Sequence, residues 1–217
     1  MGNFNQLFKV DPNVFACWMA LLTQVPSTYL WLLRLPSTAE AALRAEAAKY
    51  GPGVASRLIF SDRIHWRHHL VVKALANISL DNPVFNSHTS GVDILWAGVP
   101  LLTVAGETMS SRVAASLLYA LPFPSLVSRS LQDYQAIAVR LVGRKQHRNL
   151  HVWRQSVQRA RGQGGGDATG VLFDQQRLVR YLEKGLLMAT ELLLEGGWRR
   201  DGGEDAGSRR AHTVVAG

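Results

Sequence analysis

The sequence contains little cysteine and no long apolar run. Its one cysteine, Cys17, has no partner for a disulfide within the chain, which indicates a reducing compartment, the cytosol or the nucleus. No run of about 18 or more apolar residues is present, so we expect no membrane-spanning helix. The first residues also lack the basic and then apolar order of a signal peptide. These absences leave one globular domain as the expected class for a chain of 217 residues.

Acidic residues are missing from one long stretch. Between Asp133 and Asp167 the chain has seven basic residues and no acidic one, which accounts for most of the formal net charge of +8. The seven are Arg140, Arg144, Lys145, Arg148, Arg154, Arg159 and Arg161. Such a stretch can bind nucleic acid or another anionic partner, and a non-catalytic binding module is therefore one alternative function. It is also typical of the solvated face of a helix, which is our interpretation.

Several catalytic signatures are absent as well. The sequence has no glycine-rich Walker loop, no paired-cysteine motif and no Gly-x-Ser-x-Gly elbow. His65, His68 and His69 form a cluster on a predicted helix. Because His68 and His69 are adjacent, they point apart on a helix and do not share one ion. We therefore predict no metal site and no cofactor.

Apolar runs rich in β-forming residues alternate with amphipathic helical patterns along most of the chain. Asp11 followed by Pro12 is typical of a helix start, and Phe15, Trp18, Met19 and Leu22 then recur at helical spacing, so they are predicted to face a core. Strands are predicted at residues 3–8, 28–34, 57–60, 78–80 and 101–104, and helices at 38–50, 66–75, 89–96, 112–121, 131–142 and 145–160. The strand at 28–34 is apolar throughout, as expected for burial on both sides. The alternation favours an α/β fold with a doubly wound, Rossmann-like parallel sheet.

Two changes in composition divide the chain. Residues 162–170 are rich in glycine and are predicted to form a linker. Residues 196–217 are rich in glycine and charge with almost nothing to bury, which predicts a disordered tail. We therefore expect a Rossmann-like lobe over residues 1–161, and a C-terminal helix over 171–195 that packs on it.

The most suggestive polar stretch joins the fourth predicted strand to the next helix. His88, Thr89 and Ser90 stand at the helix start, where free backbone N–H groups, two hydroxyls and the positive end of the helix dipole suit a diphosphate. Asp93 lies one turn later, where its carboxylate can accept hydrogen bonds from a ribose. In a parallel sheet this loop lies at the carboxyl ends of the strands, where ligands bind. The alternative is a purely structural helix cap.

A second candidate follows the first predicted strand. Lys9 lies at a carboxyl end too, and its ammonium group can stabilise a leaving diphosphate. The alternative is an ordinary exposed lysine.

Three ungapped strings carry a family resemblance. They are Asn-Phe-Asn-Gln-Leu-Phe-Lys-Val-Asp-Pro at residues 3–12, Asn-Ser-His-Thr-Ser-Gly-Val-Asp-Ile-Leu-Trp-Ala-Gly-Val-Pro at 86–100, and Gly-Glu-Thr with Ser-Arg-Val-Ala-Ala-Ser within 106–116. In this order they resemble the C-terminal catalytic lobe of protein O-GlcNAc transferases. The resemblance covers roughly residues 2–195.

The resemblance implies a two-lobed GT-B glycosyltransferase that inverts the anomeric centre, needs no metal and uses UDP-GlcNAc as donor. The implied acceptors are serine and threonine hydroxyls of cytoplasmic or nuclear proteins. The family holds them with an N-terminal lobe and tetratricopeptide repeats that this sequence lacks, so we expect a fragment with little or no activity alone. A protein O-fucosyltransferase of the SPINDLY type, using GDP-fucose, is the rival within enzymes, and the string at residues 3–7 argues against it.

The resemblance also implies seven site residues. Lys9 is the catalytic one, because it would neutralise the departing UDP. The other six bind the donor: Gln6, His88, Thr89 and Ser90 at the diphosphate, Asp93 at the ribose and His69 beside the uracil.

The sequence departs from the family near the nucleoside. Trp66 stands where the family usually has a lysine, and Val71 and Val72 lie where it has arginines. Those groups help seat the nucleoside, so Arg67 or Lys73 would have to compensate for their loss.

Overall fold

The computed structural model describes residues 1–121, 123–143, 147–160 and 171–194. It divides into two units, residues 1–174 and 175–217. The predicted linker at 162–170 and the predicted tail at 196–217 lie outside the described residues.

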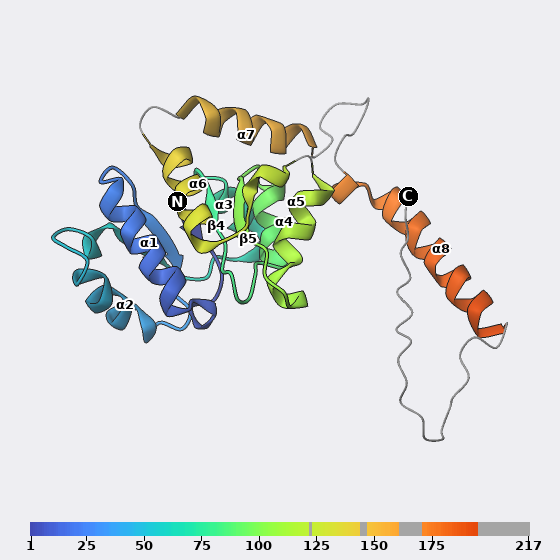
Figure 1. The fold of residues 1–217 in the computed structure, drawn as a ribbon, viewed down its shortest axis with the longest axis horizontal. Helices are drawn as coiled ribbons and strands as arrows, with labels where there is room; N and C mark the ends of the chain where they lie inside the picture. Colours follow the sequence, from blue (N-terminus) through green and yellow to red (C-terminus); the bar gives the residue numbers. More distant parts are fainter. Residues whose placement is uncertain (122, 144–146, 161–170, 195–217) are drawn as a thin grey trace, which may run out of the picture. The chain divides into compact units, whose positions relative to one another are not determined.

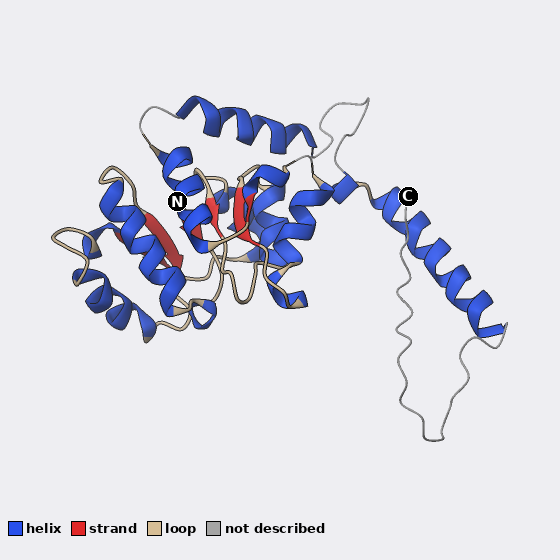
Figure 2. Ribbon diagram, viewed as in Figure 1, coloured by secondary structure: helices blue, strands red, loops and turns tan. Residues whose placement is uncertain are grey.

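The first unit is built on a six-stranded parallel sheet with the order β3-β2-β1-β4-β5-β6. Figure 2 shows its strands enclosed by helices. The strands are β1 (Gly2–Asn3), β2 (Leu30–Leu33), β3 (Leu58–Ser61), β4 (Ser79–Leu80), β5 (Leu101–Val104) and β6 (Val127–Ser128). The strand order reverses between β1 and β4, which is the position where open α/β sheets bind ligands. The predicted doubly wound α/β fold is confirmed.

Helices cover both faces of the sheet (Figure 1). They are α1 (Pro12–Gln24), α2 (Ala39–Ala48), α3 (Trp66–Lys73), α4 (Thr89–Trp96), α5 (Val113–Ala120), α6 (Leu131–Val142) and α7 (His147–Ala160). The chain moves from β1 to β2 in one direction and from β4 to β5 in the other, so right-handed crossovers put α1 and α4 on opposite faces. In agreement, α1 packs beside α6, whereas α4 packs beside α3 and α5.

The start of α1 follows from its sequence. The Asp11 carboxylate accepts hydrogen bonds from the backbone N–H groups of Asn13 (2.9 Å) and Val14 (3.1 Å), which otherwise have no partner in a first helical turn. The four apolar residues predicted to face the core from this helix are all buried. They are Phe15, Trp18, Met19 and Leu22.

Three strands differ from their prediction. The strand predicted at residues 3–8 is only the two-residue β1, and a 3₁₀ helix, η1 (Leu7–Lys9), follows it. Strand β2 is buried on one side only, because Trp31 and Leu33 are half-buried and line a cavity. Strand β6 was not predicted, since two residues give no periodicity to detect.

The second unit contains α8 (Gln175–Leu194), which lies within the range predicted for the terminal helix, residues 171–195, and has no buried residue. Its packing on the lobe stays a prediction. In the part of the chain that is described, no helix is both long and apolar enough to cross a membrane.

The basic stretch is partly structural. Arg154 on α7 donates hydrogen bonds to the carbonyl oxygens of Ala74 (2.7 Å) and Ala76, just beyond α3, so its guanidinium is not simply solvated. Arg144 and Lys145, which the nucleic-acid alternative needs, lie outside the described residues.

Candidate functional site

The loop between β4 and α4, residues 81–88, lies at the carboxyl end of β4 beside the point where the strand order reverses. The carbonyl of His88 accepts the first helical hydrogen bonds of α4, from the N–H groups of Gly91 (2.9 Å) and Val92 (3.2 Å). The N–H groups of Thr89 and Ser90 therefore have no acceptor inside the helix. His88 and Ser90 are half-buried and Thr89 is exposed, so this helix start is open to a ligand.

A buried carboxylate, that of Asp81, fixes the loop through hydrogen bonds. Asp81 is fully buried, and its Oδ1 accepts hydrogen bonds from the Ser87 backbone N (2.6 Å) and the Ser87 Oγ (2.7 Å). Its Oδ2 accepts from Thr103 Oγ1 at 2.7 Å. Burial raises the pKa of Asp81 because it removes water from the ionised form, and these hydrogen bonds oppose that effect.

Two buried asparagines fasten the loop to its neighbours. Asn86 donates from Nδ2 to the carbonyl of Asn82 (2.7 Å) and accepts at Oδ1 from the N–H of Ala114 in α5 (3.2 Å). Asn3, at the end of β1, donates from Nδ2 to the carbonyl of Leu80 at 2.7 Å. The loop is thus held by β1, β5 and α5 together, which makes it a rigid platform.

A further pair of hydrogen bonds leads to the start of α4. Ser90 Oγ donates to Asn5 Oδ1 at 2.8 Å, and Asn5 Nδ2 donates to Ser87 Oγ at 2.8 Å. Sequence reasoning missed Asp81, Asn5 and Ser87. The one signal available was that polar residues directly follow apolar strands at the carboxyl ends.

Lys9 lies against the same loop. Its Nζ donates to the carbonyl of Asn86 at 3.3 Å and lies 3.9 Å from the ring centroid of Phe85. The Phe85 ring also stacks on His88, with 4.9 Å between the ring centroids. Burial lowers the pKa of Lys9, and the negative charge of Asp81 partly opposes this. The structure therefore brings Lys9 together with the loop that ends in His88.

Gln6 stands one turn before Lys9. Its carbonyl accepts the Lys9 N–H at 3.1 Å, and its side chain is exposed at the carboxyl end of β1. Gln6 is therefore near the site through its backbone, while its side chain points to solvent.

Asp93 and His69 come together between α3 and α4. Asp93 Oδ2 lies 2.9 Å from Lys73 Nζ and 3.3 Å from His69 Nε2. The second contact is close but lacks hydrogen-bond geometry, which leaves His69 Nε2 buried without a hydrogen-bond partner among the described residues. Lys73, which the sequence offered as a compensating cation, is thus paired with the proposed ribose ligand.

A cavity of about 620 Å³ lies at the carboxyl ends of β2 and β3. Aromatic side chains form much of its wall, and His69 and Lys73 join it to Asp93. The lining residues include Phe4, Trp31, Ile64, His65, Trp66 and Val72. Such a largely apolar space with aromatic walls suits a planar ring.

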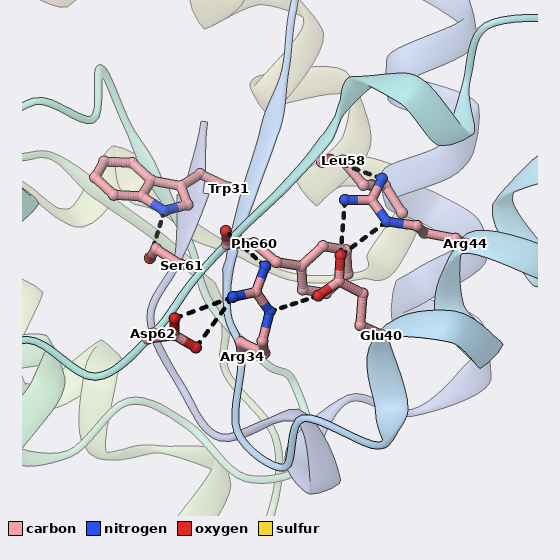
Figure 3. Close-up of polar contacts among 8 residues, drawn as sticks. All are labelled: Trp31, Arg34, Glu40, Arg44, Leu58, Phe60, Ser61 and Asp62. Atoms are coloured by element: carbon pink, nitrogen blue, oxygen red, sulfur yellow. Dashed lines mark hydrogen bonds and ion pairs between the residues drawn. The ribbon is translucent and has the colours of Figure 1, made fainter.

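Polar contacts brace the wall of this cavity (Figure 3). Trp31 Nε1 donates to Ser61 Oγ at 2.8 Å. Arg34 binds both carboxylate oxygens of Asp62 at 3.1 Å and pairs through Nε with Glu40 of α2 at 2.5 Å. The pairing with Arg34 lowers the pKa of Glu40, so the carboxylate keeps its charge. The outer wall is therefore held by hydrogen bonds and ion pairs in addition to packing.

The three neighbouring histidines do not form a metal centre. Within residues 1–121, 123–143, 147–160 and 171–194, no three His, Cys, Asp or Glu side chains gather closely enough to hold a metal ion.

Comparison with known proteins extends these observations. The chain matches the family model described as glycosyl transferase family 41 over residues 1–180. It is similar to a UDP-N-acetylglucosamine–peptide N-acetylglucosaminyltransferase of Caenorhabditis elegans, with 45% identity over 139 residues, or 64% of this chain. The Arabidopsis thaliana protein SEC, whose name describes the same activity, is 36% identical over 194 residues, or 89% of this chain. A mutant O-GlcNAc transferase of Thermobaculum terrenum has a similar solved structure, with a TM-score of 0.68 and 28% identity over 81% of this chain.

These proteins are much longer than the chain described here. The chain spans 12% of the length of the Caenorhabditis elegans relative and 19% of the Arabidopsis thaliana one. It spans 35% of the Thermobaculum terrenum chain.

Proposed function

This chain belongs to glycosyl transferase family 41, and from that premise we propose that it binds UDP-GlcNAc as one lobe of an inverting, metal-independent protein O-GlcNAc transferase. In this proposal the GlcNAc passes to serine or threonine hydroxyls of proteins. The observation that carries it is the position of Lys9, whose ammonium lies on the loop that begins α4.

The diphosphate is proposed to bind at the start of α4. The free N–H groups of Thr89 and Ser90, the Thr89 hydroxyl and the positive end of the helix dipole are donors of the kind that phosphate oxygens accept. His88 Nε2 lies 3.2 Å from the carbonyl oxygen of Ser110, so Nδ1 is the ring nitrogen left for the diphosphate. The exposed side chain of Gln6, just before η1, is proposed to turn toward the bound diphosphate.

The nucleoside is proposed to extend toward the aromatic cavity. Asp93 would accept hydrogen bonds from the ribose hydroxyls, and its Oδ1 is the oxygen that the ion pair with Lys73 leaves available. His69 lies both in the cavity wall and beside Asp93, so it would contact the base. Trp66 offers an aromatic face in the place where the family usually carries a positive charge.

The chemistry asked of this lobe is stabilisation of the leaving group. An acceptor hydroxyl oxygen attacks the anomeric carbon from the side opposite UDP, the bond to the diphosphate oxygen breaks, and the anomeric centre is inverted. Negative charge then grows on the diphosphate. Lys9 exchanges its weak contacts with a carbonyl and an aromatic ring for this charge, and the α4 dipole supplements it.

The protein acceptor and the cellular compartment are part of the same proposal. Acceptors would be held by an N-terminal lobe and tetratricopeptide repeats of the kind the family carries. The single cysteine, Cys17, is a buried free thiol with a pKa raised to about 11 by burial, which fits a reducing compartment. We therefore place the activity in the cytosol or nucleus.

Calorimetric titration with UDP-GlcNAc tests the proposal. Lys9→Ala and Asp93→Ala should each weaken binding by ~1–3 kcal/mol, or roughly 5- to 150-fold, because each removes a charged contact to the donor. Lys49→Ala is the matched control, since Lys49 pairs with Glu46 on the surface of α2 and should leave the affinity unchanged. If both site variants bind like the wild type, the site assignment is wrong. Tighter binding of GDP-fucose than of UDP-GlcNAc would favour the fucosyltransferase alternative instead.

A further inference from the structure

Four side chains form an unbroken hydrogen-bonded relay from the buried floor of the loop to the start of α4. Ser90 Oγ contacts Asn5 Oδ1 (2.8 Å), Asn5 Nδ2 contacts Ser87 Oγ (2.8 Å), and Ser87 Oγ contacts Asp81 Oδ1 (2.7 Å). Asn5, Ser87 and Asp81 are buried, so water does not interrupt the relay. Only Ser90 reaches the surface where the diphosphate is proposed to bind.

The charge of Asp81 determines the direction of every bond in this relay. An ionised carboxylate is acceptor-only, so the single hydroxyl proton of Ser87 must point to Asp81. Ser87 Oγ then accepts from Asn5, whose amide must present Nδ2 to it and Oδ1 to Ser90. The Ser90 proton therefore points inward to Asn5, which agrees with the positions of Oδ1 and Nδ2 in the Asn5 amide.

This arrangement conflicts with anion binding at Ser90. A diphosphate oxygen has no proton to donate. If the Ser90 hydroxyl directs its own proton inward, only its lone pairs face the diphosphate oxygen, and the two acceptors repel each other. The relay reverses if Asp81 Oδ1 gains a proton. Asp81 then donates to Ser87 Oγ, and the Asn5 amide turns by 180° so that its Oδ1 accepts from Ser87 and its Nδ2 donates to Ser90. The Ser90 hydroxyl is then free to point its proton outward.

We propose that donor binding at the start of α4 is coupled to uptake of one proton by Asp81, which acts as a positioning residue by orienting the Ser90 hydroxyl. The proton comes from solvent, one O–H bond forms at Asp81 Oδ1, and no other covalent bond changes. This inference rests on the proposed function, since it needs the diphosphate to bind where that proposal puts it.

The surroundings of Asp81 favour this uptake. Burial raises its pKa, and an incoming diphosphate adds negative charge that disfavours the ionised carboxylate further. Three other titratable groups belong to the elements around it. Lys9 of η1 opposes protonation through its positive charge, Tyr134 of α6 stays neutral because burial raises its pKa well above 10, and His88 stands in the same loop.

The coupling predicts the sign of the pH dependence. Because the complex holds one proton more than the free protein, affinity is highest below the free-state pKa of Asp81 and falls as pH rises above it. The loss approaches about tenfold per pH unit until the pKa of the complex is reached.

Calorimetry with UDP-GlcNAc in two buffers of different ionisation enthalpy measures the protons taken up. UDP-GlcNAc is the suitable probe because its diphosphate has no titrating proton near neutral pH. Ser90→Ala breaks the relay at its half-buried end, so the wild type should take up more protons than Ser90→Ala, which keeps only the uptake caused by the negative charge of the diphosphate. Thr89→Ala removes a hydroxyl that lies outside the relay, so it should weaken binding while keeping the full uptake.

Proton uptake that does not depend on the relay is common to all three proteins and cancels in this comparison. Equal proton uptake by the wild type and Ser90→Ala, with binding intact, overturns the relay alone. Loss of the extra uptake in Thr89→Ala as well overturns it too, because the effect would then belong to any hydroxyl at the helix start. Absence of binding by the wild type at every pH overturns the proposed function and the relay with it.

Discussion

At the scale of single residues, buried polar side chains decide the shape of the candidate site. Tyr134 is fully buried on α6, where its hydroxyl accepts from Trp18 Nε1 (3.1 Å) and donates to the carbonyl of Asp81 (3.0 Å). It thus connects α1, α6 and the first residue of the loop. A side chain far from the ligand holds the backbone of Asp81 in place.

Replacing Tyr134 by phenylalanine removes the hydroxyl and keeps the ring. The Trp18 N–H and the Asp81 carbonyl are then buried without partners, so the free energy of unfolding should fall by ~1–3 kcal/mol. Urea denaturation measures this loss. Tyr119→Phe is the control, because Tyr119 is 61% exposed and should change stability little. A Tyr134→Phe protein as stable as the wild type would mean that water replaces the hydroxyl.

The sequence singled out the residues at the start of α4 and none of the buried residues that support them. His88, Thr89 and Ser90 were chosen because local sequence marks a helix start, and their role in donor binding stays a prediction. Asn5 and Ser87 were missed because their hydrogen bonds join residues 82 to 85 positions apart, and no local pattern records such a pairing. The ion pair of Lys73 with Asp93 was hidden for the same reason, since it depends on how α3 and α4 pack.

At the scale of elements, the sequence placed helices more accurately than the two-residue strands β1 and β6. The predicted bounds of α4, α6 and β5 agree with the structure, because each has strong apolar periodicity or a clear boundary. Strand β6 was not predicted because its two residues carry no pattern of their own. Only their pairing with β5, Val127 with Thr103 and Ser128 with Val104, defines the strand. Short strands of this kind owe their existence to the neighbouring strand.

Gly91 on α4 tests how closely the helix lies on the loop. A Cβ added there would lie 3.2 Å from Ser87 Cβ and 3.2 Å from Leu117 Cδ1, so both neighbours must shift by a few tenths of an ångström. Because Ser87 is held rigidly by Asp81, Gly91→Ala should lower the UDP-GlcNAc affinity several-fold in calorimetry. It should also lose the gain of ~1 kcal/mol that alanine normally brings to a helix interior.

Gly185→Ala is the matched control for that substitution. Gly185 lies within α8, and nothing lies within 4 Å of an added Cβ, so helicity measured by circular dichroism should rise. The donor affinity should stay unchanged. If Gly91→Ala binds the donor as well as Gly185→Ala does, the loop is more compliant than its hydrogen bonds indicate.

At the scale of the whole molecule, the proposed function gives the described lobe the task of holding and releasing a diphosphate, and its side chains fit that task better than activation of an acceptor. Its positive groups, Lys9 and the start of α4, converge on one loop. The two acidic side chains placed there are both engaged, Asp81 by Ser87 and Thr103 and Asp93 by Lys73. Among the described residues, neither is available to take the proton of an acceptor hydroxyl.

This imbalance predicts binding without transfer by the 217-residue chain. With UDP-GlcNAc tritium-labelled in the sugar and a serine-containing peptide as acceptor, the chain should transfer no label to the peptide. This should hold at protein concentrations where calorimetry detects donor binding. Joining it to the remaining portion of the Caenorhabditis elegans relative should restore transfer, and Lys9→Ala in that chimera should abolish it, because leaving-group stabilisation would then be the missing step. Transfer by the chain alone that is lost in Lys9→Ala would contradict this division of labour. It would mean that the acceptor hydroxyl loses its proton to a group within these 217 residues, and Asp93, released from Lys73, would be the first side chain to test.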